Sequence, residues 1–121
     1  MSTYRQIIER VDLVKPNALE EQWKLRWLMN LNGRIAAEVF QFGIEEVREL
    51  EGSYPESMEW EPLVTYPHED IYDLWLQAQI DLHNGETDRY QNTITAYNAA
   101  YVNFVCWFAN YYDPGKGTKE V

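Results

Sequence analysis

The sequence predicts an all-α protein of a single domain, with four main helices and a long irregular segment in the middle of the chain. Apolar side chains between Asp88 and Tyr112 recur at steps of 3 and 4 residues, as along one face of an α-helix. Pro and Gly are absent from that stretch but punctuate residues 41–67. Only a short turn separates the final helix from the one before it, which predicts a C-terminal antiparallel helical hairpin.

The first helix is predicted from Tyr4 to Val14. Thr3 and Gln6 have the spacing of a capping box, in which each side chain bonds to the backbone N–H of the other residue. Pro16 follows and cannot continue the helix, so the helix is expected to end before it.

The second helix is predicted over residues 18–40, with Asn17 and Glu20 as a second capping pair. Its expected buried face is a row of apolar residues at every fourth position. The row consists of Leu19, Trp23, Trp27, Leu31, Ile35 and Val39, and Leu28 lies beside it. Because a strict four-residue step drifts around the axis, the buried band is skewed or the helix bends. Asn32-Gly33 is the natural bend point, since glycine weakens a helix interior.

Residues 41–67 form a predicted arm, a long loop with little regular structure. A short helix is predicted over 44–51 and a short strand over 63–65. Loops of this length in compact domains are usually functional or disordered, and the aromatic content of this one argues against simple disorder. Acidic and apolar residues interleave along it, which indicates either ordinary solvation or a surface that docks a partner. Both interpretations stay open at this point.

Pro67 is predicted to lie in the first turn of the third helix, and Asn84-Gly85 to end that helix. The final helix is predicted from about Thr87 to Tyr112. Its almost wholly aromatic row is expected to be covered by the preceding helix and the two N-terminal helices. The row consists of Tyr90, Ile94, Tyr97, Tyr101, Phe104, Phe108 and Tyr111. The tail, residues 113–121, has too little apolar content to fold alone and is expected to be flexible.

The charge excludes some classes of protein. A formal charge of −10 argues against a sequence-specific nucleic-acid surface and against binding to an anionic membrane. The acidity is concentrated, because residues 41–70 carry nine acidic groups and one basic group. Cys106, the one cysteine, excludes an internal disulfide and a cysteine-based zinc site and fits a reducing, cytoplasmic setting. The chain has no apolar run long enough to span a membrane, and its N-terminal residues lack the apolar core of a signal peptide.

No catalytic or metal-binding constellation is predicted, and no cofactor or small-molecule substrate is expected. His83 lacks a metal-ligating partner at helical spacing, and Cys106 lacks a neighbouring base or cation that would lower the pKa of a thiol. An enzyme would need a cleft in which His68 or His83 converges with the acids at positions 69, 70 and 73. Acids at a helix start more often face water, so an enzyme is the weakest interpretation.

Several segments carry a resemblance to a known group of proteins. The first, residues 63–72, reads Leu-Val-Thr-Tyr-Pro-His-Glu-Asp-Ile-Tyr, and it is followed by 78–81, 84–92 and 97–101. Residues 8–16, the Trp-bearing second helix and Asn32-Gly33 are also similar. These segments resemble small phage and prophage proteins of Gram-positive bacteria. That group is similar to the head–tail connector proteins of long-tailed bacteriophages, also called adaptor or head-completion proteins.

The resemblance implies a structural subunit of virion assembly that forms a homo-oligomeric ring beneath the portal of the capsid, with DNA passing through the ring. It implies no enzymatic activity, and its partners are other copies of the chain and portal or other head–tail proteins. It places the protein in the bacterial host cytoplasm during assembly and at the head–tail junction of the virion. The alternative is a small helical protein–protein interaction or regulatory module of a prophage.

Candidate partner-binding residues lie in the arm and the tail, because connectors use loops and the C-terminal tail to contact their neighbours. They are Tyr54, Met58, Trp60, Leu63, Tyr66, Lys116 and Lys119. Asn103 and Asn110 are candidates for an oligomer seam, since they share one face of the final helix. They either hydrogen-bond across that seam or face water, and the sequence favours neither.

Overall fold

The computed structural model describes residues 2–111, and within these residues the fold is all-α, with no strand. The elements are α1 (Tyr4–Val14), α2 (Glu21–Glu38), α3 (Ile44–Arg48), the 3-10 helix η1 (Glu56–Glu59), α4 (Asp70–His83) and α5 (Thr87–Tyr111). The predicted helical class is therefore confirmed. The predicted short helix over 44–51 forms as α3 but ends at Arg48. The prediction for residues 113–121 lies outside the described part of the chain.

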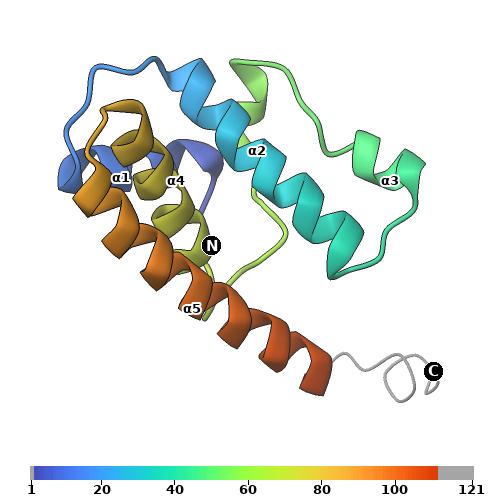
Figure 1. Ribbon diagram of the computed structural model, residues 1–121. Coiled ribbons are helices and arrows are strands. Elements are labelled where there is room, and N and C mark those ends of the chain that lie inside the picture. The colour runs from blue at the N-terminus through green and yellow to red at the C-terminus, as the bar shows by residue number, and fades with distance from the viewer. Residues whose placement is uncertain (1, 112–121) are drawn as a thin grey trace.

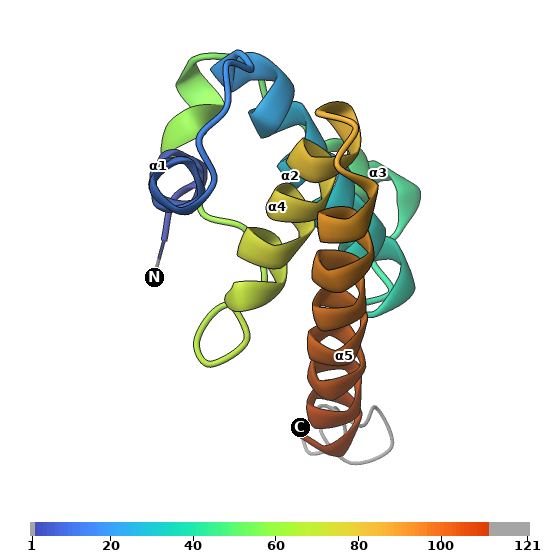
Figure 2. The same cartoon turned by 60° about the vertical axis from the view of Figure 1, so that its left-hand side comes forward.

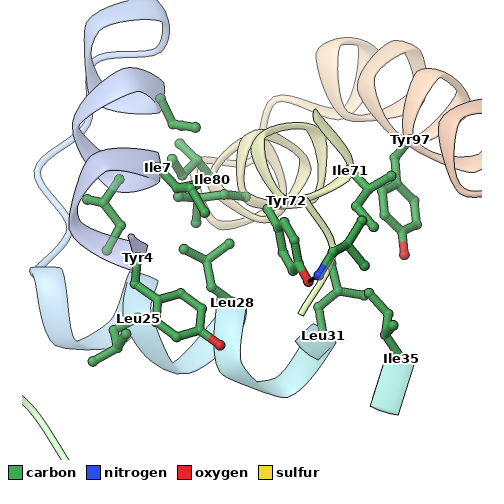
Figure 3. Packing of buried hydrophobic residues seen from close by; sticks show 14 of the residues in the cluster. Tyr4, Ile7, Leu25, Leu28, Leu31, Ile35, Ile71, Tyr72, Ile80 and Tyr97 are labelled. Carbon is green, nitrogen blue, oxygen red and sulfur yellow. Dashed lines mark hydrogen bonds between the residues drawn. The ribbon is translucent and has the colours of Figure 1, made fainter. Parts of the chain in front are cut away.

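The core lies where α1, α2 and α4 meet, and α5 packs along α4 (Figure 1). Side chains from all three helices converge there, including Ile7 of α1, Leu28 of α2 and Tyr72 of α4 (Figure 3). Each of these three side chains is fully buried. Burial of one large apolar side chain contributes about 1.5–3 kcal/mol, so this shared interior is the main source of stability.

The capping box predicted at the start of α1 is present. The Gln6 backbone N–H donates to Thr3 Oγ1 at 3.2 Å, and the Thr3 N–H donates to Gln6 Oε1 at 2.9 Å. These two bonds satisfy backbone donors that the first helical turn leaves without partners. The helix ends at Val14, where the Lys15 N–H donates to Val11 O, so both predicted bounds are correct.

α2 begins at Glu21 rather than Ala18, and Asn17 does not cap it. The Asn17 side chain instead accepts from the Leu19 N–H at 3.0 Å and from Lys24 Nζ at 3.2 Å. Lys24 Nζ also donates to both carboxylate oxygens of Asp12, at 2.9 and 3.0 Å. Polar side chains around a buried ammonium therefore organise the connection between α1 and α2.

The buried face of α2 differs from the predicted row of every fourth residue. Its buried residues are Lys24, Leu25, Leu28, Leu31, Asn32, Ile35 and Ala36. Steps of three and four residues follow the helical period of 3.6, whereas a strict four-residue step leaves the core-facing side after two turns. Trp23 is consequently 52% exposed. No break occurs at Asn32-Gly33, through which α2 is continuous.

Residues 41–67 pack back onto the helical body. The Tyr4 N–H at the start of α1 donates to Trp60 O at 2.9 Å, and Met58 of η1 is fully buried. The strand predicted over 63–65 is wrong. The Leu63 N–H donates to Asn32 Oδ1 at 2.9 Å, and the next N–H donates to a tyrosine hydroxyl at 3.0 Å. Side chains thus satisfy the backbone groups that a neighbouring strand would otherwise have to pair.

α4 begins at Asp70, so Pro67 lies in the turn before the helix and not in its first helical turn. Gly85 has a φ of 73° in the turn that follows α4, a left-handed conformation that glycine adopts without steric cost. The chain reverses direction at this turn, and α5 runs back beside α4 (Figures 1 and 2). Trp75 and Tyr97 join the two helices with their ring centroids 5.2 Å apart.

Candidate interaction surfaces

The aromatic row of α5 is buried in its middle and becomes exposed towards the C-terminal end of the helix. Tyr97 and Phe104 are buried, at 7% and 1% exposure, whereas Tyr111 is 68% exposed. Burial raises the pKa of the Tyr97 phenol to about 12. The expectation that the whole row is sequestered therefore fails at its end. The C-terminal turns of α5 extend past the other helices (Figure 2), which leaves too little protein around Tyr111 to cover it.

A second face of α5 is exposed along its length, and we call it the α5 outer face. It consists of Asn92, Ala96, Ala99, Asn103, Cys106 and Asn110, all of which are exposed. These residues follow each other at steps of 4, 3, 4, 3 and 4, the spacing of a coiled-coil seam. The two asparagines predicted for an oligomer seam thus lie on one continuous surface with small side chains between them. Val102, which is 58% exposed, borders that surface.

An apolar groove of about 580 Å³ lies between the end of α2, residues 63–65 and the later turns of α5. Its walls include Val39, Phe40, Val64, Phe104, Val105 and Phe108. Phe40 and Phe108 stack on each other in its lining, with centroids 4.9 Å apart and an interplanar angle of 26°. The groove and the α5 outer face lie on different sides of the same helix, so α5 presents two distinct surfaces.

The candidate partner-binding residues of the arm do not gather on one surface. Tyr66 is 83% exposed in the turn before α4, and Trp60 and Tyr54 are 43% and 44% exposed. Leu63 is half-buried, and Met58 is fully buried in the core and offers no surface to a partner. The remaining two candidates, Lys116 and Lys119, lie outside the described residues.

Another groove, of about 720 Å³, lies between α2 and the segment that contains α3, and nothing in the sequence predicted it. Arg26, Arg34 and Arg48 line it, and we call it the arginine groove. Two of these residues belong to α2 and the third to α3, so no local motif joins them. One signal that could have indicated it is the position of Trp23 in the row of every fourth residue. Such a row leaves the core-facing side of the helix, so Trp23 must meet solvent or another surface.

His68, His83 and Asp73, which are among the candidates for catalysis, each contact another side chain. His68 packs on Trp107 with ring centroids 5.1 Å apart, and His83 packs on Trp27 with centroids 4.9 Å apart. Asp73 holds Arg10 through two hydrogen bonds of 2.7 and 2.9 Å. Among residues 2–111 no three metal-ligating side chains gather into a group. His68 and His83 thus contribute to aromatic packing, and Asp73 contributes to an ion pair between α1 and α4.

Comparison with protein-family models, with curated proteins and with solved structures finds no match to this chain. Within the described residues, none of the helices combines the length and the apolar character that crossing a bilayer requires.

Proposed function

We propose that this protein is a structural subunit of virion assembly, of the head–tail connector kind that its sequence resembles. The subunit forms a homo-oligomeric ring on the portal through α5. One observation carries the proposal: the α5 outer face is solvent-exposed along five turns and has the spacing of a helix–helix seam.

The chemistry of the α5 outer face favours a second helix as its occupant. Ala96 and Ala99 allow a close approach of another backbone, and Cys106 adds a small apolar side chain. Asn103 and Asn110 recur seven residues apart, at one position of the repeat. An asparagine buried at such a position specifies register, because its burial costs free energy unless a polar group of the neighbouring subunit faces it. The two asparagines would thus align neighbouring subunits.

The apolar groove supplies the second patch that a ring requires. A closed ring forms when one patch of a subunit binds a different patch of its neighbour, since an interface of identical patches stops at a dimer. The aromatic wall formed by Phe40 and Phe108 belongs to a surface other than the α5 outer face. Aromatic residues are enriched in protein interfaces, which supports a role for this wall in subunit contacts.

Electron microscopy of the purified chain, alone and after co-expression with a portal protein, tests the proposal. The unsubstituted chain is expected to form rings at the portal. Cys106→Glu is expected to prevent ring formation, because it places a charge in the seam. Leu13→Glu is the matched control, since Leu13 is 86% exposed on α1 and the added charge is the same. A chain that stays monomeric with and without portal protein would contradict the proposal.

The second candidate function is a helical interaction module that binds its partner through the arm. It is favoured by Tyr66, which is 83% exposed at the tip of a turn. Deletion of the arm would not test it cleanly, because the deleted segment includes Met58 and Val64 of the core. Tyr66→Ala leaves the core intact. If the arm binds the partner, this substitution is expected to abolish pull-down of the partner. Ring formation would be unchanged by the same substitution.

A further inference from the structure

The basic residues of the chain divide into two sets. Eight of the ten Lys and Arg residues lie in the described part of the chain, and five of these form ion pairs with carboxylates. The three without such an ion pair are Arg26, Arg34 and Arg48, and all three line the arginine groove. In a chain with twice as many acidic as basic residues, carboxylate partners are abundant. The clustering of unpaired guanidinium groups is therefore local and does not follow from the composition.

The three arginines line the groove from two elements. Arg26 and Arg34 lie two turns apart on α2, and Arg48 lies on α3; all three are exposed. The guanidinium carbon of Arg34 lies 4.8 Å from the centroid of the ring of Trp75, which is not among the residues that line the groove, so this cation–π contact directs the Arg34 charge towards α4. The N–H donors that remain for a ligand in the groove are those of Arg26 and Arg48. The groove thus offers donors that are suited to bidentate binding of carboxylates.

The lining of the groove mixes polar and apolar side chains, and the apolar ones come from both sides of the groove. The apolar lining residues include Trp23, Leu25 and Met29 of α2, Val47 of α3 and Leu50. The 52% exposure of Trp23 is high for a large aromatic residue on a helix whose other face is buried. A ligand that satisfies only the arginines would leave this apolar surface in water, so the groove fits a ligand that carries both carboxylates and an apolar side chain.

Two acidic residues, Glu38 and Glu51, also line the groove, and neither forms an ion pair with its arginines in the described structure. They disfavour nucleic acid as the occupant. A phosphate backbone carries a charge at every nucleotide and would meet these carboxylates, in a chain of net charge −10. A peptide can place its acids opposite the arginines and neutral side chains opposite Glu38 and Glu51.

We propose that the arginine groove binds an acidic segment of another protein, with carboxylates on Arg26 and Arg48 and an apolar side chain against Trp23. The site is separate from the α5 outer face and adjoins the apolar groove at Glu38, which lines both grooves. It gives the protein a docking surface for an acidic peptide that operates whether or not α5 mediates ring formation.

Selection from a displayed library of short random peptides tests the proposal with the full-length protein. The enriched peptides are expected to contain several Asp or Glu residues around an aromatic or aliphatic residue. Fluorescence anisotropy with the most enriched peptide then measures affinity. Arg26→Gln and Arg48→Gln are each expected to weaken binding about tenfold, the size of one lost charged hydrogen bond. Added salt is expected to weaken it further.

Arg5→Gln and Arg89→Gln are the matched controls, because each removes the same charge at a site outside the groove. Both are expected to bind the peptide as the unsubstituted protein does. Enrichment of peptides without acidic residues, equal losses in the control variants, or no enrichment at all would overturn the proposal. Displacement of the peptide by a single-stranded oligonucleotide would also overturn it. So would sedimentation data in which Arg26→Gln abolishes self-association, since another copy of the chain would then be the occupant of the groove.

Discussion

The Tyr72 hydroxyl donates to Asn32 Oδ1 at 2.8 Å, and this single bond ties α4 to α2 inside the core. The same amide oxygen accepts from the Leu63 N–H, and the same hydroxyl accepts from the Val64 N–H at 3.0 Å. Two side chains therefore hold a backbone segment that has no strand partner in the described structure. A buried polar pair of this kind is stable only while every donor finds its acceptor.

Substitution of either residue is expected to destabilise the fold. Tyr72→Phe leaves the Val64 N–H without an acceptor, which costs about 1–3 kcal/mol. Asn32→Ala leaves both the Tyr72 hydroxyl and the Leu63 N–H unsatisfied, so its loss is expected to be larger. Urea denaturation of both single variants and of the double variant measures these effects. The double variant is expected to lose less than the sum of the two, and strictly additive losses would contradict the shared network.

The ion pair of Lys24 and Asp12 is expected to contribute more than the ion pairs at the surface. The Lys24 side chain is 3% exposed, so Asp12→Ala leaves a nearly buried ammonium without its carboxylate. The expected loss is about 3 kcal/mol in the free energy of unfolding. Glu59→Ala is the control, because it removes the partner of Arg5 in an exposed pair, and its expected effect is below about 1 kcal/mol. Similar losses in the two variants would rule out this difference.

Truncation of a buried and of an exposed side chain of α5 is expected to change stability by very different amounts. Phe104→Ala removes a ring that is 1% exposed and is expected to cost about 3–5 kcal/mol, because the cavity cannot fully close. Tyr111→Ala, at 68% exposure, is expected to change stability by less than about 0.5 kcal/mol. Thermal unfolding followed by circular dichroism compares the two variants. A large loss in Tyr111→Ala would mean that the end of α5 belongs to the core.

Two glycine substitutions are expected to have opposite signs. A Cβ at Gly52 would lie 2.5 Å from Ser57 Cβ and 2.8 Å from the Trp60 ring, so Gly52→Ala must displace the segment around η1. The expected loss is about 1–3 kcal/mol. A Cβ at Gly33 would meet only Val47 Cγ1, at 3.9 Å, and Gly33→Ala is expected to stabilise α2 by up to about 1 kcal/mol. Denaturation midpoints of the two variants that shift in the same direction would contradict this account.

Alkaline pH is expected to unfold the protein through its buried tyrosines. Burial raises the pKa of Tyr97 from 10.0 to about 12, and burial also raises the pKa values of Tyr4 and Tyr72. Between the unfolded and folded pKa values the unfolded chain binds fewer protons, so stability is complete below about pH 10 and falls as the pH rises. Each such tyrosine contributes a slope of about 1.4 kcal/mol per pH unit.

Denaturant titrations at increasing pH, together with tyrosinate absorbance, measure this dependence. Tyr97→Phe is expected to reduce the slope, because it removes one of the titrating groups while it keeps the ring. A free energy of unfolding that stays constant above pH 10 would contradict the assignment of these phenols to the core.

The sequence by itself determined the helical class, both bounds of α1 and the span of α5 to within a residue of its described end. These features follow from local signals: a capping box, a glycine turn and a long row with the period of a helix. The row also identified Tyr97 and Phe104 as core residues. Local chemistry suffices here because helix formation and capping depend on residues within one or two turns of each other.

Only the tertiary structure decided which distant residues contact each other and which of them share a surface. The sequence predicts Asn17 as a helix cap, but its side chain accepts from Lys24. It predicts Asn32 as a bend point, but the Asn32 side chain accepts from the Leu63 N–H, 31 positions away in the sequence. The arginine groove likewise joins α2 and α3 in space. Hydrogen bonds and charges between distant segments leave no periodic trace in a sequence, since each partner is free to be any distance away along the chain.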